Sequence, residues 1–294
     1  MGNQELSSGV RRPRKKHRIL KALICLVLLF AVMAGYARYI EPYSLTKEEV
    51  QYISDDLAVL PGGTKIAIFA DTHFSEYYTP ENFEKVVDRI NAEEPDLIFF
   101  LGDLIDDYST YSGDVRKIEE GLRSLHARIG KYAVYGNHDY GGKMEFDYPD
   151  VMKAGGFRLL INESVYLEDL NLEIMGIDDM VIGYGDPTAA ASLKDERYNV
   201  VLCHEPDIAD YLKDYAVDLM LSGHTHGRQI NLWFFDDYIL PTYGKKYVKG
   251  EFDLPAADDK DLRLYVTRGI GTTKIPMRFA SPPEINIIEL NGRS

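Results

Sequence analysis

Metal-binding residue types are concentrated in five short polar segments of this 294-residue chain. Five of the seven histidines lie in these segments, together with several aspartates and one asparagine. Imidazole suits zinc, iron and manganese, and carboxylate suits the harder of these ions. The segments therefore predict a site for divalent metal ions, and they read Asp71-Thr72-His73, Gly102-Asp103, Gly136-Asn137-His138-Asp139, His204 and Gly223-His224-Thr225-His226.

The balance of charged and neutral side chains fits a pair of cations. Two divalent ions about 3.5–4 Å apart repel each other, so a site for both needs a bridging carboxylate and a mixed set of anionic and neutral ligands. Asp71 and Asp103 are anionic, whereas the Asn137 carbonyl and the histidines are neutral. A lone Asp-x-His or Gly-Asp is commoner in solvated turns. Five such segments, each directly after an apolar run, are not explained by turns.

The apolar runs that precede these segments predict the elements that position them. Short runs bounded by glycine and polar residues are typical of strands buried on both faces. Segments 80–93 and 115–129 carry apolar residues at helical spacing. The alternation of strand and helix predicts an α/β sheet with parallel strands, and ligands of such sheets bind beyond the carboxyl ends of the strands. The five polar segments should therefore meet at one edge of the sheet. The apolar runs that precede them are 65–70, 96–101, 131–135, 199–203 and 217–221.

The remaining part of the chain reads as further β-structure. Residues 160–177 alternate as short strands, and three later segments, 247–252, 262–266 and 284–290, are expected to be antiparallel strands. We therefore predict the α/β class, with two packed sheets flanked by helices.

The N-terminal region has the pattern of a membrane signal. A basic cluster at 11–18 precedes an apolar stretch, 22–37, which approaches the roughly 20 residues that span a bilayer. Basic residues on its N-terminal side favour a cytoplasmic tail and an extracytoplasmic catalytic domain. We predict a cytoplasmic basic tail (1–18), a transmembrane signal anchor (19–38), a juxtamembrane connector (39–62) and a catalytic domain (63–294). The alternative is export with signal cleavage near Ala34 or Ala37.

The connector leaves one structural choice open. Thr46-Lys47-Glu48-Glu49 is compatible with the capped start of a short helix. The alternation of Val50 and Tyr52 is equally compatible with an edge strand.

The net charge of −14 is unevenly distributed along the chain. Residues 1–38 carry a net charge of +7, and residues 39–294 carry −21. An acidic surface repels a polyphosphate backbone, so we expect no nucleic-acid partner. A small phosphorylated substrate is still compatible with this charge, because bound metal ions reverse the local sign.

The ordered motifs DTH, GDLID, GNHD, CHEPD and GHTHG resemble those of the calcineurin-like metallophosphoesterases, over about residues 60–291. The resemblance implies a four-layer α/β/β/α sandwich and two divalent ions, of manganese, zinc or iron. Three later segments, PTYGKKYVKGEF, TRGIG and PMRFASPPEI, resemble a bacterial branch of membrane-associated phosphodiesterases. Some members of that branch hydrolyse UDP-diacylglucosamine in lipid A synthesis.

The resemblance also implies a role for each site residue. Asp71, His73 and His226 match the ligands of the first metal, Asp103 bridges, and Asn137, His204 and His224 match the ligands of the second. His138 matches the residue that contacts the scissile phosphate and assists the leaving group. Asp139 would orient His138, and its alternative role is a helix N-cap.

Two positions depart from the common pattern of the family. Ala70 replaces the usual serine before the first ligand, at a position that binds no metal. Arg228 follows the last motif where many relatives have glycine. Arg228 is a candidate to bind a substrate phosphate, and pairing with a surface carboxylate is the equal alternative. The further candidates for phosphate binding are Lys245, Lys246, Arg268 and Arg278.

These expectations converge on two-metal hydrolysis of a phosphodiester or pyrophosphate bond, in a phosphorylated small molecule or a lipid-linked cell-envelope substrate. A phosphomonoesterase, including a protein phosphatase, would use the same metal chemistry and is the first alternative. A non-catalytic scaffold is the second, and it would be indicated by the loss of ligands or of His138. The chain retains all of them.

Overall fold

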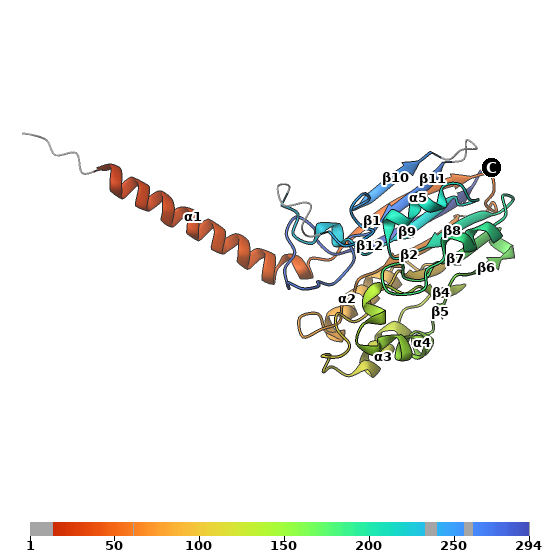
Figure 1. Ribbon diagram of the computed structural model, residues 1–294, viewed down its shortest axis with the longest axis horizontal. Coiled ribbons are helices and arrows are strands. Elements are labelled where there is room, and N and C mark those ends of the chain that lie inside the picture. Colours follow the sequence, from red (N-terminus) through yellow and green to blue (C-terminus); the bar gives the residue numbers. More distant parts are fainter. Residues whose placement is uncertain (1–13, 61, 233–239, 256–260, 294) are drawn as a thin grey trace, which may run out of the picture.

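Two six-stranded sheets form the centre of the computed structural model, which describes residues 14–60, 62–232, 240–255 and 261–293 (Figure 1). The first sheet has the order β1-β12-β2-β3-β4-β5 and the second has the order β10-β11-β9-β8-β7-β6. The strands of the first sheet are β1 (Thr46–Ser54), β12 (Glu284–Gly292), β2 (Thr64–Phe69), β3 (Leu97–Phe100), β4 (Gly130–Ala133) and β5 (Arg158–Leu159). Those of the second are β10 (Gly250–Leu254), β11 (Leu262–Val266), β9 (Leu219–Ser222), β8 (Tyr198–Leu202), β7 (Leu172–Gly176) and β6 (Glu163–Leu167).

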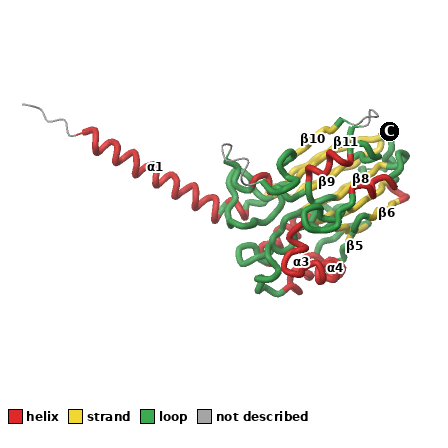
Figure 2. Tube along the Cα trace, in the orientation of Figure 1, coloured by secondary structure: helices red, strands yellow, loops and turns green. Residues whose placement is uncertain are grey.

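Helices cover the outer faces of the sheets, as the colouring by secondary structure shows (Figure 2). The α-helices are α1 (Arg14–Tyr39), α2 (Pro80–Asn91), α3 (Val115–Arg123), α4 (Met144–Ala154) and α5 (Ala209–Leu212). The 3₁₀ helices are η1 (Glu41–Tyr43), η2 (Asn137–Lys143), η3 (Glu168–Leu170), η4 (Pro187–Ser192), η5 (Pro206–Ile208) and η6 (His226–Arg228).

Three apolar clusters hold the four layers together. One joins α2, α3 and α4 to the outer face of the first sheet, and the second lies between the two sheets. The third joins α5 and η4 to the outer face of the second sheet. The predicted α/β sandwich of two sheets flanked by helices is confirmed.

Local sequence explains why α2 forms where it does. Thr79 and Asn82 make a reciprocal capping box at its start, and Pro80 occupies the first turn. Phe83, Val86 and Ile90 recur at helical spacing and are buried against the first sheet. The helix therefore fixes the path of the chain from β2 to β3.

The predicted strands that lead into the polar segments are confirmed, and two other details differ. The helix expected over 115–129 ends at Arg123, because Arg128 and Ile129 instead donate backbone hydrogen bonds to Pro95 and Asp96 and lead into β4. The C-terminal strands are not all antiparallel: β11 is parallel to β9, and β12 is parallel to β1 but antiparallel to β2.

Residues 39–62, expected to be a connector, contribute an edge strand to the first sheet. β1 pairs with β12 in parallel along its whole length, from Thr46 to Ser54. Tyr52 is 2% exposed and lies in the cluster between the sheets. Of the two alternatives left open for this segment, the structure has the edge strand, because its apolar alternation matches the sheet. The folded unit therefore begins before residue 63.

Helix α1 projects from the domain as a rod (Figure 1). Among the described residues, one helical segment, His17–Tyr43, is long and apolar enough to cross a membrane, with a mean hydropathy of 2.4. Its apolar side chains from Ile19 to Val32 are exposed. Of the predicted basic tail, residues 1–13 lie outside the described part of the chain.

Candidate metal centre

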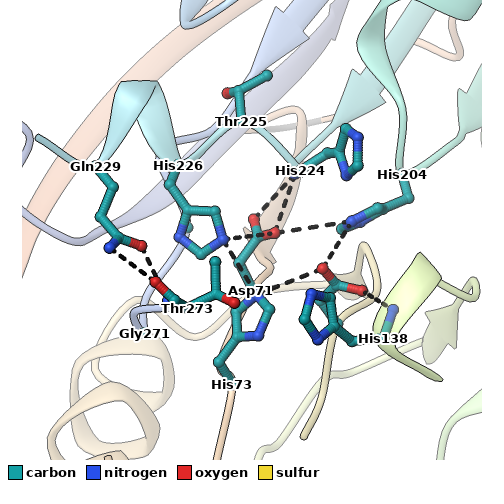
Figure 3. Close-up of polar contacts among 12 residues, drawn as sticks. Asp71, His73, His138, His204, His224, Thr225, His226, Gln229, Gly271 and Thr273 are labelled. Carbon is teal, nitrogen blue, oxygen red and sulfur yellow. Dashed lines mark hydrogen bonds and ion pairs between the residues drawn. The ribbon is translucent and has the colours of Figure 1, made fainter. Parts of the chain in front are cut away.

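The seven predicted ligands come together at the carboxyl ends of five parallel strands. Asp71 and His73 follow β2, Asp103 follows β3, and Asn137 follows β4 in the first sheet. His204 follows β8, and the pair His224 and His226 follows β9 in the second sheet. Figure 3 shows the rings of His73, His138, His204 and His226 around Asp71, with the His224 ring beside that of His204. The site thus lies where the edges of the two sheets meet.

The donor atoms form two groups on either side of Asp103. In the first group, His226 Nε2 lies 3.6 Å from Asp71 Oδ1 and 3.1 Å from His73 Nε2. In the second, His204 and His224 gather with Asp103, whose Oδ2 is 3.1 Å from His204 Nε2. The same Oδ2 lies 3.4 Å from His73 Nε2 in the first group. Asp103 therefore faces both groups, as a bridging carboxylate must.

In His204 and His224, one ring nitrogen is hydrogen-bonded to a backbone carbonyl outside the candidate metal centre, and the other ring nitrogen faces the centre. His204 Nδ1 lies 2.6 Å from the Leu101 carbonyl, which leaves Nε2 as its inner atom. His224 Nε2 lies 2.8 Å from the Thr242 carbonyl, which leaves Nδ1. These carbonyls assign each imidazole a tautomer with a free inner lone pair, as partners of metal-bound histidines do.

Asn137 Oδ1 is buried and has no hydrogen-bond partner among the described residues. A buried polar atom without a partner carries a desolvation cost of about 1–3 kcal/mol. A cation between the loops would relieve that cost, and the donor set of oxygen and imidazole suits a divalent ion. The residues present therefore fit metal binding.

Five of the predicted ligands have left-handed backbone conformations. Their φ angles are 53° at Asp71, 42° at His73, 61° at Asp103, 73° at His224 and 51° at His226. This region is uncommon for residues other than glycine, and it persists where surrounding contacts enforce it, often at functional sites. The loops are thus held in conformations that local sequence preference alone would not produce.

Burial and neighbouring charges set the protonation of these side chains. Burial and the adjacent His204 lower the pKa of His224 to about 3, so His224 is neutral. Burial alone would raise the pKa of Asp103, but the imidazoles of His204 and His138 lower it well below the ordinary value. Burial lowers the pKa of His73, but hydrogen bonds to Asp103 and Asp106 outweigh this and raise it to about 9. A cation beside His73 must therefore displace a proton.

Glycines allow the loops to approach Asp71 closely. Gly269 has a φ of 65°, and a Cβ added to it would lie 2.5 Å from Asp71 Oδ2. Gly269 belongs to the TRGIG segment, which resembles a segment of membrane-associated phosphodiesterases but has no physical role that the sequence alone reveals. Its physical role is to leave room for the Asp71 side chain.

Asp139 does not have the contact that we expected for it. Among the described residues, no hydrogen bond or ion pair joins its carboxylate to the His138 ring. Asp139 instead accepts backbone hydrogen bonds from Gly136, Asp103 and Leu104, each at 2.8 Å. Its carboxylate is fully buried and joins the Asp103 loop to the Asn137 turn. The contact predicted with His138 is thus replaced by one that positions Asp103.

Asp106 is the residue that orients His138, and the motif comparison did not single it out. The Asp106 carbonyl accepts from His138 Nδ1. The Asp106 side chain lies 3.1 Å from His73 Nδ1. One residue thus supports both histidines, and its place as the last letter of GDLID is the only sequence signal for it.

A pocket of about 280 Å³ opens over the two ligand groups. His138, Arg228 and Lys274 lie in its wall with Ile230 and Ile275. Of the other predicted phosphate-binding cations, Lys246 pairs with Asp210 at 2.7 Å and Arg268 pairs with Glu284. Arg278 is buried, and its guanidinium donates to backbone carbonyls of its own region. Lys245, Lys246, Arg268 and Arg278 are not among the described residues that line this pocket.

Comparisons with known proteins agree with this geometry. A family described as "Calcineurin-like phosphoesterase" matches residues 64–228. The uncharacterized metallophosphoesterase YkuE of Bacillus subtilis is 41% identical, covering 88% of this chain and 90% of that protein. The phosphodiesterase YaeI of Escherichia coli is 29% identical, with 87% and 92% covered. The UDP-2,3-diacylglucosamine pyrophosphatase LpxG of Chlamydia muridarum is 30% identical, with 86% and 91% covered.

Proposed function

This chain belongs to the calcineurin-like phosphoesterase family of metal-dependent hydrolases, and we propose that it uses two divalent ions to hydrolyse a phosphodiester or pyrophosphate bond. The observation that carries the proposal is the pair of ligand groups on either side of Asp103, at the floor of a pocket lined by His138. The native ions are proposed to be manganese, zinc or iron.

The two groups divide the ligands between the ions. Asp71, His73 and His226 would hold one ion, and His204 and His224 would hold the other together with Asn137, which lies beside His224 in the pocket wall. Asp103 would be shared, because its Oδ2 lies near both His73 and His204. When bound, such a pair lowers the pKa of an attacking water and stabilises the charge of the transferring phosphoryl group. The protein supplies the orientation of the ligands.

His138 would transfer a proton to the leaving oxygen. The Asp106 carbonyl fixes Nδ1, so the opposite nitrogen, Nε2, is free to face a substrate in the pocket. The His138 side chain is 24% exposed, in contrast to the fully buried His73. A partly exposed imidazole beside the ligands can contact a phosphate ester and act as a general acid.

We further propose that the substrate is lipid-linked or belongs to the cell envelope, and that α1 is a signal anchor with the catalytic domain outside the cytoplasm. The supporting observations are the apolar, exposed α1 and the likeness to a UDP-2,3-diacylglucosamine pyrophosphatase. A tether to the membrane raises the effective concentration of an enzyme near such a substrate. Arg228 and Lys274 in the pocket wall would receive the phosphates.

Hydrolysis of model esters tests the reaction type. With Mn²⁺, the full chain in detergent should cleave bis-p-nitrophenyl phosphate faster than p-nitrophenyl phosphate, and EDTA should abolish both activities. Asp103→Asn should lower kcat at least about 100-fold, because the shared negative charge is lost. Faster turnover of the monoester would favour the phosphomonoesterase alternative, and full activity of Asp103→Asn would contradict the ligand assignment.

Arg228→Ala tests phosphate binding by the pocket wall. The variant should raise KM for the diester about 10-fold, with a smaller change in kcat, because the guanidinium holds a non-reacting phosphate oxygen. Steady-state kinetics give both constants. An unchanged KM would assign Arg228 to pairing with a carboxylate, which is its alternative role.

A further inference from the structure

The end of α1 is docked on the loop that joins β11 to β12. Ala37 is 6% exposed, and its carbonyl accepts a 2.9 Å hydrogen bond from the Arg278 backbone N–H. Four residues later, Glu41 is 2% exposed and its Oε1 accepts a 2.7 Å hydrogen bond from the Ser281 backbone N–H. The apolar helix is therefore joined to the domain by buried polar contacts at its C-terminal end.

The loop that joins β11 to β12 also contacts the predicted metal ligand His226. The Ser281 hydroxyl donates a 2.8 Å hydrogen bond to the His226 carbonyl. Gln229 and Thr273 exchange two hydrogen bonds, with Gln229 Nε2 donating to the Thr273 carbonyl and the Thr273 N–H donating to Gln229 Oε1 (Figure 3). The loop is thus fixed both to η6, where His226 lies, and to the end of α1.

His226 depends on such support because its backbone is strained. Its φ is 51°, and the following residue, Gly227, has a φ of 56°. A Cβ added to Gly227 would lie 2.8 Å from the Ser281 hydroxyl, so Ser281 packs directly against this turn. Conformations of this kind persist only where neighbouring contacts enforce them.

We infer that residues 37–43, where the apolar helix enters the domain, position the proposed metal ligand His226, acting from Glu41 through Ser281. Glu41 holds the Ser281 backbone, and the Ser281 hydroxyl holds the His226 carbonyl. The inference rests on the proposed metal centre. It means that the anchor is part of the support of the site, so removal of the chain through Tyr43 would impair the first metal group while leaving the second in place.

Mn²⁺ binding to point variants of the full chain in detergent tests this inference. Ser281→Ala removes only the hydroxyl, and Glu41→Ala removes the acceptor of the Ser281 N–H. Each should weaken one of two Mn²⁺ equivalents about 10-fold in calorimetric titrations, the lower end of the effect of outer partners of metal ligands. The other equivalent should be unchanged.

Two matched variants separate the hydrogen-bond chain from general damage. Glu41→Gln keeps an oxygen acceptor and should restore wild-type binding. Ser44→Ala lies in the same region but loses only a bond to the Ile40 carbonyl, and it should bind as the wild type does. Equal weakening of both Mn²⁺ equivalents, wild-type binding by Ser281→Ala, or failure of Glu41→Gln to restore binding would each overturn the inference.

The titration also separates this inference from the proposed function. A wild-type chain that binds two Mn²⁺ ions but hydrolyses no diester would contradict the proposed reaction, while the comparison of variants would still support or overturn the positioning role. A wild-type chain that binds no Mn²⁺ would overturn both.

Discussion

Asp103 and Asp139 hold each other's loops in place: the Asp103 backbone N–H donates to Asp139 Oδ2 at 2.8 Å. In return, Asp103 Oδ1 accepts from the His138 backbone N–H, next to Asp139, at 2.8 Å. One backbone hydrogen bond therefore orients the Asp103 carboxylate, which is the proposed bridge, and another holds the Asp103 main chain. The turn after β4 thus supports both groups of predicted ligands, because it holds Asp103 between them.

Asp139→Asn should damage this connection. An asparagine amide has one acceptor oxygen, so at least one of the three buried N–H groups would lose its partner, at a cost of about 1–3 kcal/mol. We expect a melting temperature lower by several degrees and weaker Mn²⁺ binding, measured by thermal unfolding and calorimetry. Asp186→Asn is the control, because Asp186 caps η4 by bonding to the Thr188 N–H and asparagine caps equally well. Wild-type behaviour of both variants would contradict the assigned role of Asp139.

His138→Ala should separate catalysis from metal binding. His138 contributes to neither ligand group around Asp103, so the variant should still bind two Mn²⁺ ions. Loss of a general acid lowers kcat by roughly 10²–10⁴-fold. Calorimetry and diester hydrolysis on the same preparation provide both values. Loss of one Mn²⁺ equivalent would instead identify His138 as a ligand.

Gly269→Ala should displace Asp71. The added Cβ would lie 2.5 Å from Asp71 Oδ2, in addition to the strain of a φ of 65°. Gly250 also has a positive φ, of 81°, but a Cβ there meets nothing within 4 Å. Gly250→Ala should therefore carry only the backbone strain of about 1–2 kcal/mol and keep its activity. We expect Gly269→Ala to lose Mn²⁺ binding; equal activity of the two variants would show that Asp71 tolerates the contact.

Mn²⁺ binding should strengthen as the pH rises. The pKa of His73 is raised to about 9, so below that pH the cation must displace a proton from its ring. For this one proton, the affinity of the first site should rise about tenfold per pH unit up to pH 9. Calorimetry in buffers of different ionisation enthalpy measures the protons released. Binding without proton release at pH 7 would contradict the assignment of His73 as a ligand.

The sequence was sufficient to predict that the candidate ligands lie at one edge, because strand periodicity and residue type are local properties. Each apolar run ends at a metal-capable side chain, and the parallel order of β2, β3 and β4 brings three of those ends together. The same local reasoning could not decide between helix and strand for 46–54, because its pairing partner, β12, lies more than 200 residues away.

Long-range support was the part that the sequence did not reveal. Asp139 follows His138 directly, yet its carboxylate points to the backbone of the preceding loop, a direction that residue spacing does not fix. Glu41 and Ser281 are separated by 240 residues, and no spacing pattern in the sequence relates them. The left-handed backbone at Asp71 and His224 depends on tertiary contacts rather than on residue preference.

Anomalous diffraction from crystals of the full chain grown with Mn²⁺ tests the two-ion centre most directly. Two peaks are expected about 3.5–4 Å apart, on either side of the Asp103 carboxylate. One peak should lie against Asp71, His73 and His226, and the other against Asn137, His204 and His224. A single peak, or two peaks that do not share Asp103, would contradict the two-ion centre.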